Sequence, residues 1–186
     1  MFTFERITYV LQFMEAFIMS WTMATISVYM FRILTPQDLG LVHIIGGVLA
    51  CSTLVFATKL ELLKKYWKTM LILGCLVDNI TELMLFYNPL YKLIGDIISA
   101  STVTIITKVL VRDAANHHWN KEGMADLRTN FKTRLDLFGN IGKLLGGAGA
   151  VIVTLTIVPS VWLNVLCMTV WYIGKGYVIN LVRHEE

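Results

Sequence analysis

Charged residues are scarce in this chain. They make up 16% of its 186 residues, whereas an average soluble domain has about a quarter. Hydrophobic residues reach 56%, and the mean hydropathy is +0.64. A soluble domain of this length does not have enough polar surface to cover so many apolar side chains. The composition therefore excludes an ordinary soluble protein and predicts an integral membrane protein.

Cysteines and catalytic motifs are equally sparse. The three cysteines, Cys51, Cys75 and Cys167, lie within apolar runs and show no CxxC spacing. We therefore expect buried thiols, with neither a disulfide nor a zinc site. No phosphate-binding GxxxxGK[ST] sequence occurs, and no GxSxG or HExxH sequence. We predict no enzyme activity, no metal and no cofactor. Because the sequence has no ATP-binding motif, any active transport would have to draw on an ion gradient.

Six apolar runs approach the length of about 20 residues that a helix needs to cross a bilayer. We predict spans at residues 9–31, 39–58, 69–87, 93–111, 137–158 and 161–181. A polar turn at 32–38, the pair Asn88-Pro89, a polar loop at 112–134 and a tight hairpin at 158–160 connect some of them. The prediction is an all-α polytopic protein with one six-helix domain over residues 1–186.

Lysine and arginine are concentrated between the apolar runs, which is typical of membrane topology and gives no indication of a nucleic-acid partner. One face would collect Arg6, Lys59, Lys64, Lys65, Lys68, Arg112, Lys121, Arg128, Lys132, Arg134, Lys143 and Arg183. The opposite face would have only Arg32 and Lys92. Positively charged loops stay in the cytoplasm, so both termini are predicted to be cytoplasmic. The protein itself is predicted to lie in the inner or plasma membrane.

The loop before the fifth run contains an apolar stripe at helical spacing. It consists of Met124, Leu127, Phe131, Leu135 and Phe138. The stripe predicts a helix, with Arg128 and Lys132 on its other side. Two interpretations stay open: an interfacial helix against anionic headgroups of the lipid bilayer, and a solvated loop helix.

Several ionisable groups fall inside the predicted spans, where a charge is costly and usually faces a cavity or a partner. Glu15 and Lys108 lie at similar depth, so they can pair between the first and fourth spans, or Lys108 can extend to the headgroups. Asp78 and Glu82 are four residues apart and share one helix face. They suit a proton or cation carrier, although neighbouring polar groups can also satisfy them. Trp21 lies deep in the first span, where it either lines a cavity or packs.

The fifth run is rich in glycine. Its glycines are Gly139, Gly142, Gly146, Gly147 and Gly149. In a bilayer, small residues let two helix backbones approach closely. Two interpretations stay open here as well: packing within one helix bundle, and a seam between two bundles.

The layout resembles one half of a major facilitator superfamily transporter. VYMFRILTPQDLGLVHIIGGVLACSTLVFATKLELLKKYWKTMLIL is similar to the first-to-third-helix region of that family, and RTNFKTRLDLFGNIGKLLGGAGAVI to its fifth helix and the approach to it. The inner loop ATKLELLKKYWK departs from the family, because it lacks the Gly-x-x-x-Asp-Arg signature.

The resemblance implies half a transporter, which two identical chains would complete as a homodimer. It implies that the second and fifth helices meet the partner, through Gly46, Gly47 and the fifth-run glycines Gly139, Gly142, Gly146 and Gly149. It also places Glu15, Trp21 and Lys108 at or near a central cavity. The expected function is secondary transport of a small organic solute by alternating access, with Glu15 as the candidate for proton coupling.

Two rival functions remain. The first is a non-transporting accessory or immunity protein that docks onto another membrane complex through its glycine face. The second is a membrane enzyme that uses Asp113, His117 or His118, and His117-His118 with Glu122 also suggests a metal site, although the spacing matches no strong ligand motif. The sequence names no substrate, transport direction or coupling ion.

Overall fold

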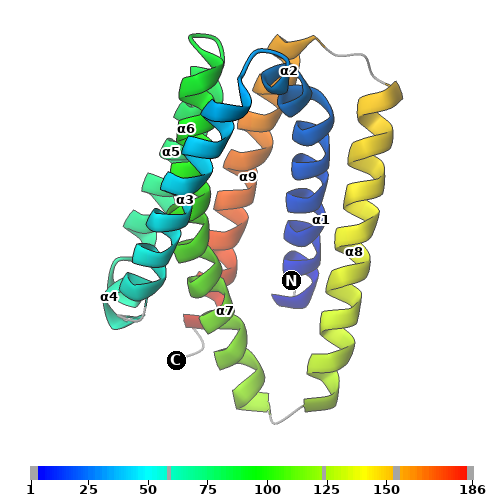
Figure 1. The fold of residues 1–186 in the computed structure, drawn as a ribbon. Coiled ribbons are helices and arrows are strands. Elements are labelled where there is room, and N and C mark those ends of the chain that lie inside the picture. The colour runs from blue at the N-terminus through cyan, green and yellow to red at the C-terminus, as the bar shows by residue number, and fades with distance from the viewer. Residues whose placement is uncertain (1–3, 58–59, 123–124, 153–155, 184–186) are drawn as a thin grey trace. The chain divides into compact units, whose positions relative to one another are not determined.

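The structure, a computed structural model, describes residues 4–57, 60–122, 125–152 and 156–183. Its helices in chain order are α1 (Phe4–Thr22), the π-helix η1 (Met23–Ser27), α2 (Val28–Phe31), α3 (Pro36–Ala57), α4 (Leu60–Lys65), α5 (Trp67–Met84), α6 (Pro89–Ser101), α7 (Val103–Glu122), α8 (Ala125–Ile152) and α9 (Ile157–Arg183). Figure 1 shows these elements. The described residues contain no strand, which confirms the predicted all-α class.

Four helical stretches among the described residues are long and apolar enough to cross a membrane. They are Leu39–Ala57, Pro89–Trp119, Thr129–Ile152 and Ile157–Val182. They correspond to the second, fourth, fifth and sixth predicted spans, and they indicate a membrane protein. The third of them extends well before residue 137, because α8 is one continuous helix.

The first and third predicted spans are not among these four stretches. Residues 9–31 are helical throughout, through α1, η1 and α2. The third span is helical only as far as Met84, where α5 ends. Charged residues lower the apolarity of both: Glu5, Arg6 and Glu15 in α1, and Lys68, Asp78 and Glu82 in α5. A total of six spans stays a prediction.

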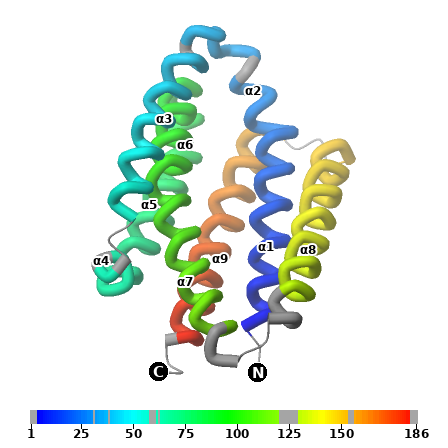
Figure 2. Tube along the Cα trace, turned by 60° about the horizontal axis from the view of Figure 1, so that its bottom comes forward, coloured from blue at the N-terminus to red at the C-terminus, as the bar shows by residue number. Residues whose placement is uncertain are grey.

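The chain divides into two compact units, of which the first combines Met1–Val28 with Val111–Glu186. In this unit α1 lies beside α8 and α9, as Figures 1 and 2 show. Gly139 faces Gln12 and Gly149 faces Trp21, so α1 and α8 run in the same direction. Gly174 faces Leu11 from an α9 that runs the opposite way. The beginning of α1 at Phe4 and the end of α9 at Arg183 therefore lie at the same end of the unit. The side of the membrane on which this end lies stays a prediction.

An aromatic cluster joins the first turns of α1 to α7 and α8 within this unit. The ring of Tyr9 stacks on Phe138 with centroids 5.2 Å apart, and Phe131 lies 5.2 Å from both Tyr9 and Trp119. Phe131 and Phe138 belong to the predicted apolar stripe. From Leu127 onward the stripe is helical as predicted, while Met124 lies outside the described residues. In this structure the rings of Phe131 and Phe138 pack against Tyr9 of α1.

The second unit is Tyr29–Leu110. Its helix α6 packs against both α3 and α5. Gly46 on α3 faces Ile97 on α6, whereas α5 and α6 form an antiparallel hairpin in which Thr81 faces Gly95. Ionisable side chains lie in this α5–α6 hairpin.

Two predicted connections are wrong. In the first half of the predicted polar loop at 112–134, residues 112–122 are helical, because α7 continues to Glu122. The helix from Ala125 onward agrees with the one that the apolar stripe predicts. The tight hairpin at 158–160 lies in the first turn of α9, which begins at Ile157. Proline is tolerated there because the first N–H groups of a helix have no partner within it. By contrast, the turn predicted at 32–38 is confirmed for residues 32–35, while residues 36–38 belong to α3, which starts at Pro36.

Candidate functional site

A buried lysine pairs with two carboxyl groups inside the α5–α6 hairpin. Lys92 Nζ on α6 lies 2.7 Å from Glu82 Oε1 on α5 and 2.7 Å from Asp96 Oδ1 one turn further along α6. The side chain of Lys92 is 1% exposed and that of Glu82 is 8% exposed, whereas Asp96 is 41% exposed. The three residues form what we call the Lys92 cluster. It joins the two helices by charge-assisted hydrogen bonds, which are stronger than neutral ones.

A second polar pair lies next to the Lys92 cluster. Ser99 on α6 donates its hydroxyl to Asp78 Oδ1 on α5, and both residues are buried. Only one of the two carboxylate oxygens of Glu82 has a hydrogen-bond partner among the described residues. Its Oε1 accepts from Lys92, while its buried Oε2 has none. The hairpin therefore holds a buried acceptor that is ready for another donor.

Local sequence signals place these side chains. Asn88 caps α6 by accepting from the Leu90 backbone N–H at 2.8 Å, and Pro89 occupies the first turn of the helix, where its missing N–H costs nothing. The predicted Asn88-Pro89 turn is thereby confirmed. Four-residue spacing puts Lys92 and Asp96 on one face of α6, as it does Asp78 and Glu82 on α5. The antiparallel hairpin brings the two faces together.

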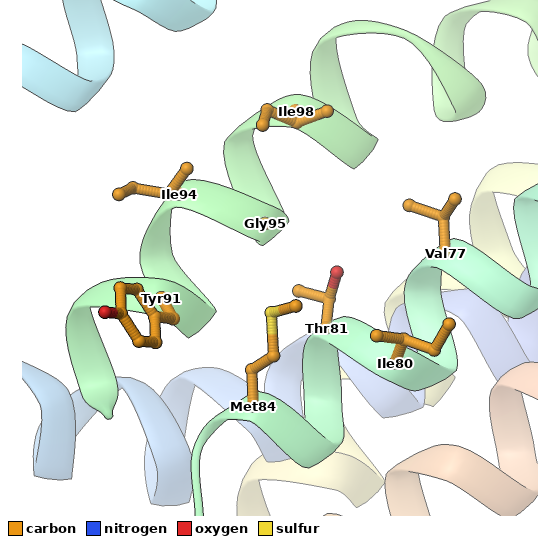
Figure 3. A pocket seen from close by; sticks show the side chains of 8 residues that line it. All are labelled: Val77, Ile80, Thr81, Met84, Tyr91, Ile94, Gly95 and Ile98. Atoms are coloured by element: carbon orange, nitrogen blue, oxygen red, sulfur yellow. The ribbon is translucent and has the colours of Figure 1, made fainter. Parts of the chain in front are cut away.

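The two helices cross where Thr81 meets Gly95. A Cβ on Gly95 would lie 2.7 Å from both Oγ1 and Cγ2 of Thr81, so glycine is what permits this approach. Beside the crossing is an apolar hollow of about 360 Å³, shown in Figure 3. It is lined by Val77, Ile80, Thr81 and Met84 from α5 and by Tyr91, Ile94, Gly95 and Ile98 from α6.

The predicted site residues fall in different places. Asp78 and Glu82 are buried and lie in the hairpin with Lys92 and Ser99. Glu15 is partly buried on α1 and Lys108 is exposed on α7. Glu15 belongs to the first unit and Lys108 to the second, so their pairing stays a prediction. Trp21 is buried in the first unit.

The glycines of α8 make a contact within the chain. A Cβ on Gly142 would strike the carbonyl oxygen of Phe13, and one on Gly146 that of Phe17, both on α1. Gly139 lies against Gln12, and Gly149 against the ring of Trp21. Ser20 adds a hydrogen bond of 2.9 Å to the Lys143 carbonyl. In this structure these glycines face α1, which is packing within one bundle; a contact with a second copy stays a prediction.

The two glycines of α3 differ from each other. Gly46 is buried, and a Cβ there would strike Ile97 on α6. Gly47 is exposed and has nothing within 4 Å of its Cβ position. Of the residues predicted to meet a partner chain, Gly47 is therefore the one whose surroundings in this structure are open.

Sequence reasoning missed Lys92 and Asp96 as site residues. The charge pattern places Lys92 on the outer face of the membrane, which stays a prediction; its side chain is 1% exposed and pairs with Glu82 and Asp96. The signal that would have found the pair is the four-residue spacing of Lys92 and Asp96 within an apolar stretch, opposite the same spacing on α5. Lys175 was missed as well. It is buried on α9, with Nζ 3.0 Å from the centroid of the Trp171 ring.

The two neighbouring histidines lie near the end of α7. The His118 ring is 4.5 Å from that of Phe4 and packs in the aromatic cluster, while the Glu122 side chain lies outside the described residues. Among the residues that the structure describes, no group of three histidine, cysteine or acidic residues could hold a metal ion. The geometry around the two histidines does not favour a metal site or an enzyme there, so the Lys92 cluster is the stronger candidate for the functional site.

Comparison with known proteins finds no counterpart: no model of a protein family, no curated protein and no solved structure matches the chain. The resemblance to the major facilitator superfamily therefore stays a prediction from layout.

Proposed function

We propose that the chain is a secondary transporter of a small organic solute that works by alternating access. The proposal includes six spans arranged like one half of a major facilitator transporter, cytoplasmic termini, and two identical chains in the inner or plasma membrane. The observation that carries it is the Lys92 cluster, which sets one ammonium and two carboxyl groups between two helices of a membrane protein.

Stability alone is a poor reason for such a cluster. Removing two charges from water costs several kcal/mol for each, at the order-of-magnitude level, and apolar side chains of similar volume often hold helices together equally well. Ionisable residues within membrane-spanning segments mark substrate pathways, ion pathways and proton relays. The partial exposure of Asp96, at 41%, leaves the cluster open on one side, which suits a group that must exchange its partner.

The pair of chains is part of the proposal, but its contact differs from the one that the glycines suggest. Gly142 and Gly146 are packed against α1, so a second copy would meet another surface. A candidate is the exposed apolar face of α3, where Leu41, Ile44 and Val48 are each more than 60% exposed. Gly47 lies on this helix and allows a close approach.

Reconstitution into liposomes tests the proposal. The purified protein would be supplied with a panel of labelled small organic cations, anions and neutral solutes, with and without a pH gradient. We expect uptake of at least one solute class by wild type. The Glu82→Gln variant should take up less, and the matched surface control Glu61→Gln should be unaffected, since Glu61 is 92% exposed on α4.

Two results would count against transport. One is the absence of flux for the whole panel from protein that is folded and correctly inserted. The other is a protein that is always purified in a fixed complex with a different membrane protein, which would instead favour the accessory or immunity role.

A further inference from the structure

The charges of the Lys92 cluster do not balance. Glu82 and Asp96 contribute −2 when ionised and Lys92 contributes +1, so the cluster carries −1. An uncompensated charge away from water is costly, and the usual remedy is to bind a proton or a counter-ion. Glu82 Oε2 is buried and has no hydrogen-bond partner among the described residues.

We infer that Glu82 and Asp96 together bind one exchangeable proton, and that this proton is the coupling ion of the transporter. Binding turns one carboxylate into a carboxylic acid and makes the cluster neutral; release restores the charge of −1. No other bond changes. The role of the proton as coupling ion rests on the proposed function, whereas the proton site itself does not depend on transport.

A proton fits the geometry better than a metal ion. Lys92 Nζ lies 2.7 Å from Glu82 Oε1 and 2.7 and 3.0 Å from the two oxygens of Asp96. The ammonium therefore already occupies the position between the carboxyl groups that a bound cation would take. A proton needs only one lone pair, and Glu82 Oε2 offers one.

The charge of −1 is counted for the Lys92 cluster alone, and the neighbouring titratable groups are counted separately. Asp78 is the other acidic residue near the cluster, and its Oδ1 accepts from Ser99. The helix α3, which packs against α6, brings two titratable groups among its described side chains, His43 and Cys51, both of them exposed. The short helix α4 touches α5 and brings Glu61, which is 92% exposed.

The difference in exposure gives the site a direction. Asp96 is 41% exposed, whereas Glu82 is 8% exposed and Lys92 1%. A proton that arrives from outside the hairpin therefore meets Asp96 first, and Lys92 links that carboxyl group to the buried one. Asp96 is the exchange end of the site and Glu82 is its interior end.

The proton count predicts a distinct result for each variant. Wild type should hold one proton on the pair near neutral pH. Glu82→Gln and Asp96→Asn should hold none, because the remaining carboxylate is neutralised by Lys92. Lys92→Met should hold two, because both carboxyl groups then lack a cation. Glu61→Gln is the matched control and should behave as wild type.

Infrared difference spectroscopy of the protein in lipid nanodiscs measures this count through the carboxylic-acid band and its shift in heavy water. We expect the band in wild type, its loss in Glu82→Gln and in Asp96→Asn, and about a twofold increase in Lys92→Met. If one variant does not fold, the wild-type band and the other variants still decide.

The inference is overturned if folded wild type shows no carboxylic-acid band near neutral pH, or if the band survives in both Glu82→Gln and Asp96→Asn. A band that appears only on replacement of sodium or potassium ions would assign the site to a metal cation instead. Flux without the band would reject the proton site and leave transport standing. The band without flux would reject transport and leave the site standing.

Discussion

The α1–α8 contact and the α5–α6 contact each hold two helices together, but they do so by different means. In the first, glycines let two helix backbones touch, with Gly142 and Gly146 against the carbonyl oxygens of Phe13 and Phe17. In the second, one glycine marks the crossing, and the helices are joined by the Lys92 cluster and by Ser99 with Asp78.

We interpret this difference as one between a structural contact and the contact that we propose to be functional. Lipid tails are as apolar as leucine, so helices in a bilayer associate through close packing and polar bonds. Close packing through small residues needs no charge and has no exchangeable partner. A charge cluster is costly to bury, and its partners can change with protonation. The α1–α8 pair is therefore the frame of its unit, and the α5–α6 pair is where we expect chemistry.

The largest effect is expected from removing the cation of the α5–α6 contact. Lys92→Met keeps the volume of the side chain but leaves Glu82 without its cation. Breaking a buried ion pair in this way costs about 3–5 kcal/mol. The free energy of unfolding in mixed micelles measures it, and Lys65→Met, at an exposed lysine of α4, should change it by no more than about 0.5 kcal/mol.

A double variant sharpens this result. Lys92→Met combined with Glu82→Leu removes the buried pair and leaves Asp96, which is 41% exposed. Replacing a buried pair by apolar groups is often neutral. Most of the lost stability should return. If the double variant is as unstable as Lys92→Met alone, the lysine acts through something other than its pairing with Glu82.

The second effect concerns the α1–α8 contact. Gly142→Leu puts a side chain where the Phe13 carbonyl oxygen lies, and a rigid backbone cannot give way as a flexible side chain can. Overpacking of this kind costs about 1–3 kcal/mol. Gly47→Leu is the control, since nothing lies within 4 Å of its Cβ position. Equal stability of the two variants would show that α1 does not cover Gly142.

The sequence predicted most of the helices, because apolar run length and the Asn88-Pro89 signal are local properties. It failed where a local rule has two outcomes. Polar residues between 112 and 122 fit a loop as well as they fit the continuation of α7. Pro159 fits a turn as well as it fits the first turn of α9.

The candidate site was half predicted. Asp78 and Glu82 were recognised because carboxyl groups in an apolar run are conspicuous. Lys92 was used only to assign the outer face, because the positive-inside rule concerns the side of the membrane on which a lysine lies and not the partners of its side chain. The antiparallel pairing of α5 with α6 brings this lysine to Glu82. The partner of the α8 glycines was likewise open until α1 was placed beside them.

A smaller effect is expected at the second polar pair of the α5–α6 contact. Ser99→Ala removes the hydroxyl that donates to Asp78, and a lost hydrogen bond of this kind costs about 1 kcal/mol. Ser52→Ala on α3 is the matched control, because its hydroxyl is exposed and bonds only to the Val48 carbonyl of its own helix, at 3.0 Å. A loss in the control as large as in Ser99→Ala would mean that the bond to Asp78 contributes nothing measurable.

The smallest effect has the opposite sign and asks whether glycine as such matters to these helices. Gly47→Ala adds a methyl group in open space and improves helix propensity, so it should stabilise a monomer by up to about 1 kcal/mol. If two chains meet along α3, the same methyl group would disturb their close approach. Stability and the fraction of dimer in lipid, both measured on one sample, separate the two cases. A gain in stability with unchanged association shows that Gly47 lies in no interface between chains. A loss of dimer shows that two chains meet along α3.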